Sequence, residues 1–225
     1  FVCMFVIEGK EYRNMFGVFK DRIDAGEKLA DLIEKHFDVD RDKTDVVAIP
    51  AGGVPVAWAM AKKMGLKLKI LLVSNILFPW TTEAGFGALS MFGDLELNRS
   101  AIRYYKISED VVEEQVRRTR EKIERRLKII PEKYLLKDRN ENAFLVDDGL
   151  ASGYTMLVAI KSSRRFYDRV YVAVPTASSY AINLISKSCD GIFCVNLRDI
   201  YPYAVADAYL EWHDVSDEEM LELLK

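Results

Sequence analysis

Two adjacent carboxylates stand at the end of an apolar run, in the stretch FLVDDGLASGYT at residues 144–155. Asp147 and Asp148 are followed at once by small and hydroxyl-bearing residues. Ionised carboxylates accept hydrogen bonds from sugar hydroxyls and can ligate divalent cations. A glycine-containing turn that opens a helix presents free backbone N–H groups and a favourable dipole to an anion. The two halves of the stretch therefore suit two different chemical groups.

A sugar phosphate satisfies both halves. Phosphate fits the loop of Ala151, Ser152, Gly153, Tyr154 and Thr155, where glycine allows a tight curl and hydroxyls add donors. The carboxylates repel phosphate and suit the hydroxyls of the same ligand, or a divalent cation. The alternative is a strand-to-helix turn in which the aspartate only caps the helix. Neither the GxxxxGK[ST] pattern of P-loops nor the GxGxxG pattern of dinucleotide-binding folds occurs in the sequence.

Short apolar runs alternate with helical patterns along most of the chain. The runs typical of strands cover residues 45–50, 68–74, 143–148, 169–175 and 191–197, and the helical patterns cover about 24–36, 54–65, 153–166 and 178–187. Apolar strands alternating with helices predict an α/β fold, a doubly wound parallel sheet covered on both faces. Ligands of such sheets bind beyond the carboxyl ends of the strands, where Asp147 and Asp148 stand.

Two segments depart from this alternation. Residues 76–106 contain glycines and scattered aromatics and predict a loop with short hairpin pieces, either a functional lid or a structural flap or dimer arm. Residues 108–130 predict a long charged helix, and its interleaved glutamates and arginines favour a solvated face over a nucleic-acid-binding face. A narrow apolar stripe would pack this helix on the protein: Val112, Val116, Thr119, Ile123, Leu127 and Ile130.

Composition places the chain among ordinary globular proteins. Its 225 residues are 50% hydrophobic and 30% charged, so we expect one domain over residues 1–225. A net charge of -3 gives no general attraction to nucleic acid or anionic membranes, and no apolar run reaches the roughly 18 residues of a membrane span. Cys3, Cys189 and Cys194 lack metal-ligand spacing. We expect reduced core thiols in a cytoplasmic protein, with a Cys189–Cys194 disulfide as the alternative.

The stretch at 144–155 resembles the phosphoribosyl-pyrophosphate (PRPP) motif of type I phosphoribosyltransferases, in which an apolar strand, two acids and a small-residue loop ending in threonine follow one another. The segments FKDRIDAGEKLADLI, VVAIPAGGVPVAWAMAKKMG, EAGFGAL and AYLEWHDVSDEEMLELL resemble a subfamily of uncharacterised predicted phosphoribosyltransferases from bacteria and archaea. The resemblance covers most of the chain and is weakest in the charged helix. It implies the type I phosphoribosyltransferase fold, with a flexible flap at about 76–106 and a C-terminal hood near 198–225.

The resemblance also implies a role for each part of the site. Asp147 and Asp148 would hold the ribose hydroxyls, act in catalysis and bind Mg²⁺ directly or through water, while residues 151–155 would hold the 5-phosphate. The pyrophosphate loop would be formed by Ala51, Gly52 and Gly53, often around an unusual cis peptide in this fold. Tyr209 or Trp212 would contact the acceptor. The implied protein is a Mg²⁺-dependent homodimer that transfers the 5-phosphoribosyl group of PRPP to an unknown acceptor, with a nucleobase as one candidate.

The pyrophosphate site departs from the subfamily pattern. The subfamily typically reads Pro-Arg-Gly-Gly where this chain has Ala51 after Pro50, and Arg-Lys where it has Ser74 and Asn75. Hydrogen bonds to charged groups are each worth about 1.5–3 kcal/mol, so these changes predict weaker pyrophosphate binding. Backbone N–H groups, magnesium, or a cation of the flap can compensate. The flap candidates are Arg99, Arg103 and Lys106.

The acceptor and the activity stay open at this point. Hypoxanthine-guanine-type enzymes have an aspartate as the candidate base where this chain has Ala151, which argues against a 6-oxopurine acceptor. Adenine-type enzymes also carry alanine there. The alternative to an enzyme is a non-catalytic member of the fold that senses PRPP or a nucleotide, acts as a regulatory protein, or scaffolds a partner. Neither hypothesis includes a nucleic-acid or membrane partner.

Overall fold

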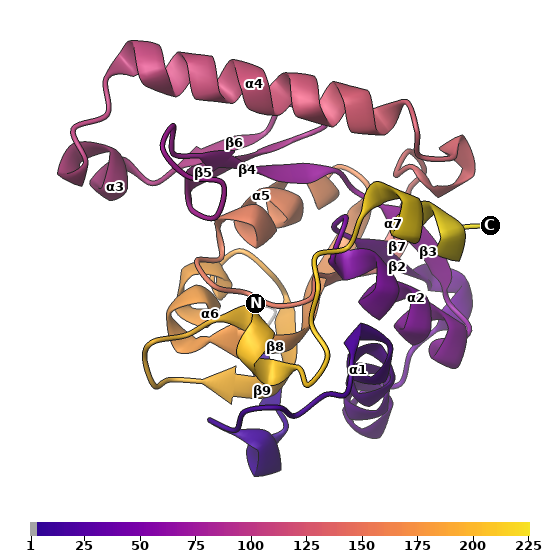
Figure 1. The fold of residues 1–225 in the computed structure, drawn as a ribbon. Helices are drawn as coiled ribbons and strands as arrows, with labels where there is room; N and C mark the ends of the chain where they lie inside the picture. The colour runs from indigo at the N-terminus through magenta and orange to yellow at the C-terminus, as the bar shows by residue number, and fades with distance from the viewer. Residues whose placement is uncertain (1–3) are drawn as a thin grey trace.

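The computed structural model describes residues 4–225, so Cys3 lies outside the described residues. Its central layer is a six-stranded parallel sheet in the order β1-β9-β8-β7-β2-β3 (Figure 1). The strands are β1 (Phe5–Glu8), β2 (Thr44–Ala48), β3 (Lys67–Ile70), β7 (Asn140–Val146), β8 (Tyr167–Ser178) and β9 (Gly191–Arg198). The predicted doubly wound parallel sheet is confirmed.

Helices cover both faces of this sheet. One core joins α1 (Arg22–His36) and α2 (Gly53–Met64) to alternate strand residues such as Val46 and Ala48. The other core joins α5 (Tyr154–Ser163) and α6 (Ser179–Ile185) to the intervening residues, such as Val47 and Ile49. Successive strand side chains point to opposite faces, so a strand buried on both faces is apolar at every position.

A smaller antiparallel sheet is formed by β4 (Val73–Leu77), β5 (Gly85–Ser90) and β6 (Leu95–Leu97). The prediction of one strand over 68–74 is therefore wrong, because β3 ends at Ile70 and β4 begins at Val73. Between them the Leu71 N–H donates to Ala48 of the large sheet, while the Leu72 carbonyl accepts from the Met91 N–H beyond β5. Both leucines are buried, so the apolar sequence does not indicate where the chain passes from the large sheet to the small one.

The segment predicted as a loop with hairpin pieces is thus more ordered than expected. Its antiparallel strands bury Phe86 and Leu89, and α3 (Arg99–Tyr104) follows them. The charged helix α4 (Glu109–Leu127) lies across this small sheet, with α5 on the other side (Figure 1). Of the predicted stripe, Val116 and Leu127 are only half-buried.

The C-terminal helix α7 (Asp217–Leu223) packs beside α2. Short 3₁₀ turns lie at Lys10–Tyr12, Arg41–Lys43, Glu132–Tyr134 and Val205–Ala208. Cys189 and Cys194 are buried free thiols, so the alternative of a disulfide is wrong. Burial raises the pKa of the Cys189 thiol to about 11. No helix within residues 4–225 is both long enough and apolar enough to cross a membrane.

Candidate functional site

Asp147 and Asp148 directly follow β7, at the carboxyl end of a strand in the middle of the parallel sheet. Each uses one oxygen within the protein. Oδ1 of Asp147 accepts from the Asp148 backbone N–H at 2.8 Å, and Oδ2 of Asp148 accepts from Arg22 Nε at 3.1 Å and Nη2 at 3.0 Å. The other oxygen of each carboxyl receives no N–H donor from the described residues and is available to a ligand.

The electrostatics of the pair oppose a double negative charge. Burial and the adjacent charge of Asp148 raise the pKa of Asp147 well above its usual range. Burial also raises the pKa of Asp148, while the Arg22 guanidinium acts in the opposite direction. A cation or hydroxyl donors placed beside the pair would favour its ionised form.

The loop between β2 and α2 approaches the acids closely. The Pro50–Ala51 peptide bond is cis. A Cβ atom on Gly52 would lie 2.1 Å from Oδ2 of Asp148, and one on Gly53 would lie 2.8 Å from the Val146 carbonyl oxygen. Glycine is therefore required here by the close approach to β7, the neighbouring parallel strand, and to the acids that follow it.

The predicted phosphate loop opens α5. Gly153 has the left-handed φ of +88°, and no described side chain caps the helix start. The first-turn N–H groups are consequently free for an anion. The Ser178 hydroxyl donates to the Ala151 carbonyl at 2.8 Å and holds the loop, whose Ala151 and Ser152 are exposed. Thr155 Oγ1 donates to Asn75 Oδ1 at 2.8 Å, which links the loop to β4.

Arg22 is a site residue that the sequence analysis missed. Its guanidinium bonds Asp148, donates from Nη1 to the His213 carbonyl at 2.7 Å and lies 4.0 Å from the centre of the Trp212 ring. The side chain is buried, although it stands in the first turn of α1. A cation is unfavourable at a helix N-terminus, so an arginine in the first helical turn indicates that an acidic partner outside the helix stabilises it.

The two hood residues have different positions. The Tyr209 hydroxyl donates to the Asp148 carbonyl at 2.6 Å, and its ring is buried between Phe19 and Trp212. Burial raises the pKa of Tyr209 well above its usual range. Tyr209 thus supports the backbone beneath the acids, whereas Trp212 lines the hollow that contains the acids.

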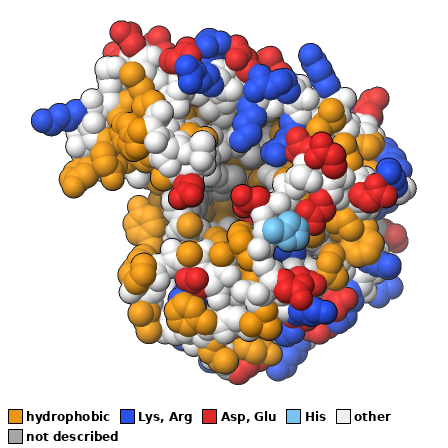
Figure 2. Space-filling view, viewed as in Figure 1, with side chains coloured by type: hydrophobic (Ala, Val, Ile, Leu, Met, Phe, Trp, Pro, Cys, Tyr) orange, Lys and Arg blue, Asp and Glu red, His pale blue; other side chains and the backbone are white. Residues whose placement is uncertain are grey.

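A hollow of about 460 Å³ brings these parts together. It is lined by Arg22, Ile49, Pro50, Ala51, Gly52, Val73, Ser74, Asn75, Leu77, Thr82, Lys122, Arg126, Asp147, Asp148, Thr155, Val205, Trp212, Asp214 and Val215. Figure 2 shows the hollow in the middle of this face, below the Lys and Arg side chains of α4. The predicted residues outside its described lining are Gly53, the loop residues 151–154, Tyr209 and the flap cations Arg99, Arg103 and Lys106.

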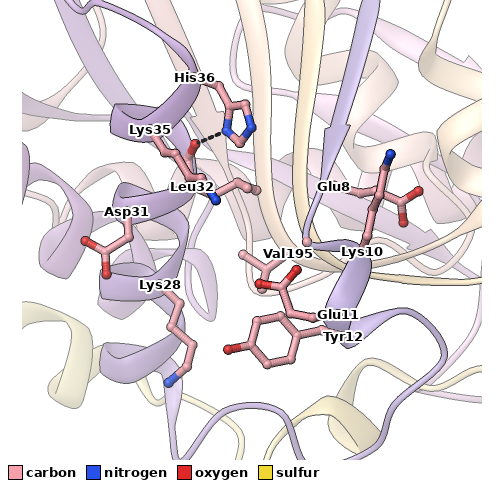
Figure 3. Close-up of a pocket in the computed structure, with 11 residues that line it drawn as sticks. Glu8, Lys10, Glu11, Tyr12, Lys28, Asp31, Leu32, Lys35, His36 and Val195 are labelled. Atoms are coloured by element: carbon pink, nitrogen blue, oxygen red, sulfur yellow. Dashed lines mark hydrogen bonds between the residues drawn. The ribbon is translucent and has the colours of Figure 1, made fainter.

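A second hollow, of about 420 Å³, lies between the end of β1 and α1 (Figure 3). Its lining mixes acidic and basic side chains, and the His36 ring nitrogen Nδ1 lies 3.0 Å from the Leu32 carbonyl oxygen. Three of its charged residues form ion pairs with residues outside it: Glu8 with Arg13, Lys28 with Asp24 and Asp31 with Lys63. The hollow therefore offers a poorer ligand site than the one containing the acids.

The donor set at the acids fits Mg²⁺ that arrives with a phosphorylated ligand. Among residues 4–225 no group of three or more His, Cys, Asp or Glu side chains is placed to hold a metal. Mg²⁺ commonly takes one or two carboxylates and completes its shell with water and substrate phosphates. The available oxygens of Asp147 and Asp148 match that arrangement.

The chain is similar to known proteins in sequence and in structure. No family model matches the chain. Over 215 residues it is 30% identical to Mycobacterium tuberculosis proteins of two strains named "Putative phosphoribosyl transferase MT0597" and "Putative phosphoribosyl transferase Rv0571c". The match covers 92% of this chain and 46% of each relative, so the chain spans about half the length of the curated relatives it matches.

A solved structure is similar over nearly the whole of both chains. The crystal structure of TT1426 from Thermus thermophilus is 29% identical, with a TM-score of 0.68. The alignment covers 92% of this chain and 97% of that chain. The fold of this chain is therefore shared by at least one protein of another organism.

Proposed function

Because the chain belongs to the type I phosphoribosyltransferase family, we propose that it transfers the 5-phosphoribosyl group of PRPP to an acceptor and releases pyrophosphate. The observation that carries this proposal is the hollow in which Asp147 and Asp148 meet the glycine loop and Thr155. Acids that can accept hydrogen bonds from hydroxyls lie near an uncapped helix start, an arrangement that would suit a phosphorylated ribose. The acceptor is an open part of the proposal, with a nucleobase as a candidate.

In the proposed reaction the bond from ribose C1 to the pyrophosphate oxygen breaks, and its electron pair leaves with pyrophosphate. A lone pair of the acceptor forms the new bond to C1, and the acceptor releases one proton to water. Positive charge develops on the ribose ring during this exchange, and the ionised acids beside it would stabilise that charge. When bound, Mg²⁺ supplies positive charge for the phosphate oxygens, and the available oxygens of Asp147 and Asp148 would hold it.

The activity can be tested by following pyrophosphate release. Purified protein, PRPP and MgCl₂ are incubated with a panel of nucleobases and amines, and we expect release that depends on one acceptor class. Asp147→Asn should reduce the rate by about 100-fold or more, as expected when a transition-state charge partner is lost. Asp168→Asn is the matched control, because Asp168 is exposed at the start of β8 and should leave the rate unchanged.

The alternative, a non-catalytic sensor of PRPP or a nucleotide, is favoured by the uncharged loop at Ala51. It would be supported by tight binding of PRPP without pyrophosphate release for any acceptor. The absence of both binding and release would contradict both functions. We also propose that the protein works as a homodimer, as the family resemblance implies.

A further inference from the structure

The hollow must accommodate a strongly anionic group next to two carboxylates if PRPP binds there. The glycine loop and the residues of β4 in the hollow supply no positive charge, since Ala51, Ser74 and Asn75 are uncharged. The described lining of the hollow includes the cations Arg22, Lys122 and Arg126. Arg22 is already engaged, because its guanidinium bonds Asp148.

Lys122 and Arg126 stand one turn apart on α4 and differ in their surroundings. Arg126 Nε donates to Asp217 Oδ1 of α7 at 2.9 Å. The ammonium of Lys122 makes neither a hydrogen bond nor an ion pair with any residue in 4–225, although it lines the hollow. Lys122 is exposed at the edge of the hollow, where partial desolvation and the charge of Arg126 lower its pKa. An anion bound in the hollow would offset the repulsion between Lys122 and Arg126 and would favour the charged form of Lys122.

The position of α4 over the hollow is held by internal contacts. Gln115 Nε2 donates to the Leu77 carbonyl of β4 at 2.6 Å, and Thr119 and Ile123 are buried beneath the helix. The same strand carries Ser74 and Asn75 into the hollow. The cations of α4 are thus held above the strand positions at which the subfamily has its own charged residues.

We propose that Lys122, assisted by Arg126, binds the pyrophosphate group of PRPP and replaces the charge missing from the glycine loop and β4. This inference rests on the proposed function, of which it names the leaving-group residues. It differs from the expectation that cations of the flap replace that charge, because Arg99, Arg103 and Lys106 do not line the hollow.

The test is calorimetric titration of the full chain with three probes in MgCl₂: inorganic pyrophosphate, PRPP and ribose 5-phosphate. Lys122→Gln should weaken pyrophosphate and PRPP binding by about tenfold or more, the effect of losing a charged hydrogen bond. It should leave ribose 5-phosphate binding within about twofold, because that ligand uses the helix start of α5 and the acids. Unchanged ribose 5-phosphate binding also shows that the variant is folded.

Arg120→Gln is the matched control, since Arg120 is an exposed arginine of α4 that does not line the hollow. It should bind all three probes as the wild type does. Wild-type affinity of Lys122→Gln for pyrophosphate and PRPP would overturn this inference and leave the proposed function intact. A wild-type protein that binds neither ribose 5-phosphate nor PRPP would overturn the proposed function and this inference with it.

Discussion

At the scale of single residues, two adjacent aspartates are held in different environments by their neighbours. Asp148 is paired with the buried guanidinium of Arg22, whereas among residues 4–225 the donor to Asp147 is the Asp148 backbone N–H. An acid whose pKa is raised by folding binds its proton more tightly in the folded state than in the unfolded state. Its contribution to stability is therefore present at low pH and is lost as the pH rises from about 4 through the raised pKa.

We expect Asp147→Asn to stabilise the protein at neutral pH, because it removes a buried carboxylate while keeping the Oδ1 acceptor. A gain of about 1 kcal/mol would raise Tm by about 2–4 °C in a protein of this size. The gain should shrink as the pH falls toward 4, where the wild-type carboxyl is protonated. Thermal unfolding followed by circular dichroism between pH 4 and 8 measures this, and a gain independent of pH would contradict the explanation.

Asp148→Asn should give a less stable protein than Asp147→Asn. It leaves Arg22 buried without its charged partner, which offsets the gain from removing a buried carboxylate, and its free energy of unfolding should be about 1–3 kcal/mol below that of the Asp147 variant. Urea unfolding at pH 7 compares the two variants. Equal stabilities would contradict the assignment of Arg22 as the partner of Asp148.

At the scale of elements, the site depends on the close approach of the loop before α2 to the end of β7. No side chain fits between them, since a Cβ atom on Gly52 would overlap the carboxyl group of Asp148. The φ of Gly52 is -62°, so its conformation is open to any residue. The requirement for glycine comes from this contact alone.

Gly52→Ala should therefore destabilise the protein by about 1–3 kcal/mol, the usual cost of overpacking, and should displace Asp148. Asp148→Ala removes the atoms that the new methyl group would meet. In the Asp148→Ala protein, Gly52→Ala should lower the free energy of unfolding by at least about 1 kcal/mol less than it does in the wild type. Urea unfolding of the four proteins in this double-mutant cycle gives the coupling, and additive effects would show that the contact is not the cause.

At the scale of the whole molecule, an aromatic patch projects from the end of the small sheet. Trp80, Tyr104 and Tyr105 are exposed and pack with Phe78 in one cluster. Hydrophobic side chains gather at that end of α4 and α3 in the space-filling view (Figure 2). Exposed apolar clusters of this kind are typical of interaction surfaces.

If the predicted homodimer forms through this patch, light scattering should give twice the mass of the chain. Trp80→Ser combined with Tyr105→Ser should shift the protein to monomer. Tyr180→Ser, a change at an exposed tyrosine of α6, should leave the dimer intact. A monomeric wild type would contradict the prediction of a dimer, and a dimeric double variant would place the interface elsewhere.

The strands, helices and acid pair were predictable because their signals are local. Apolar runs predict strands buried on both faces, and the turn after residue 146 combines acids, glycines and hydroxyls within a few positions. The roles expected of Asp147, Asp148 and the phosphate loop follow from these local signals and from the resemblance, and they stay predictions for the experiments above.

Only the tertiary structure decided which distant side chains meet the acids. Arg22 lies 126 positions from Asp148, and Lys122 belongs to a helix whose charge pattern indicates a solvated face. Periodicity predicts which face of an element is buried, but the packing of whole elements decides what that face meets. The same reason explains the apolar run at 68–74, which shows burial throughout while the chain passes from one sheet to another.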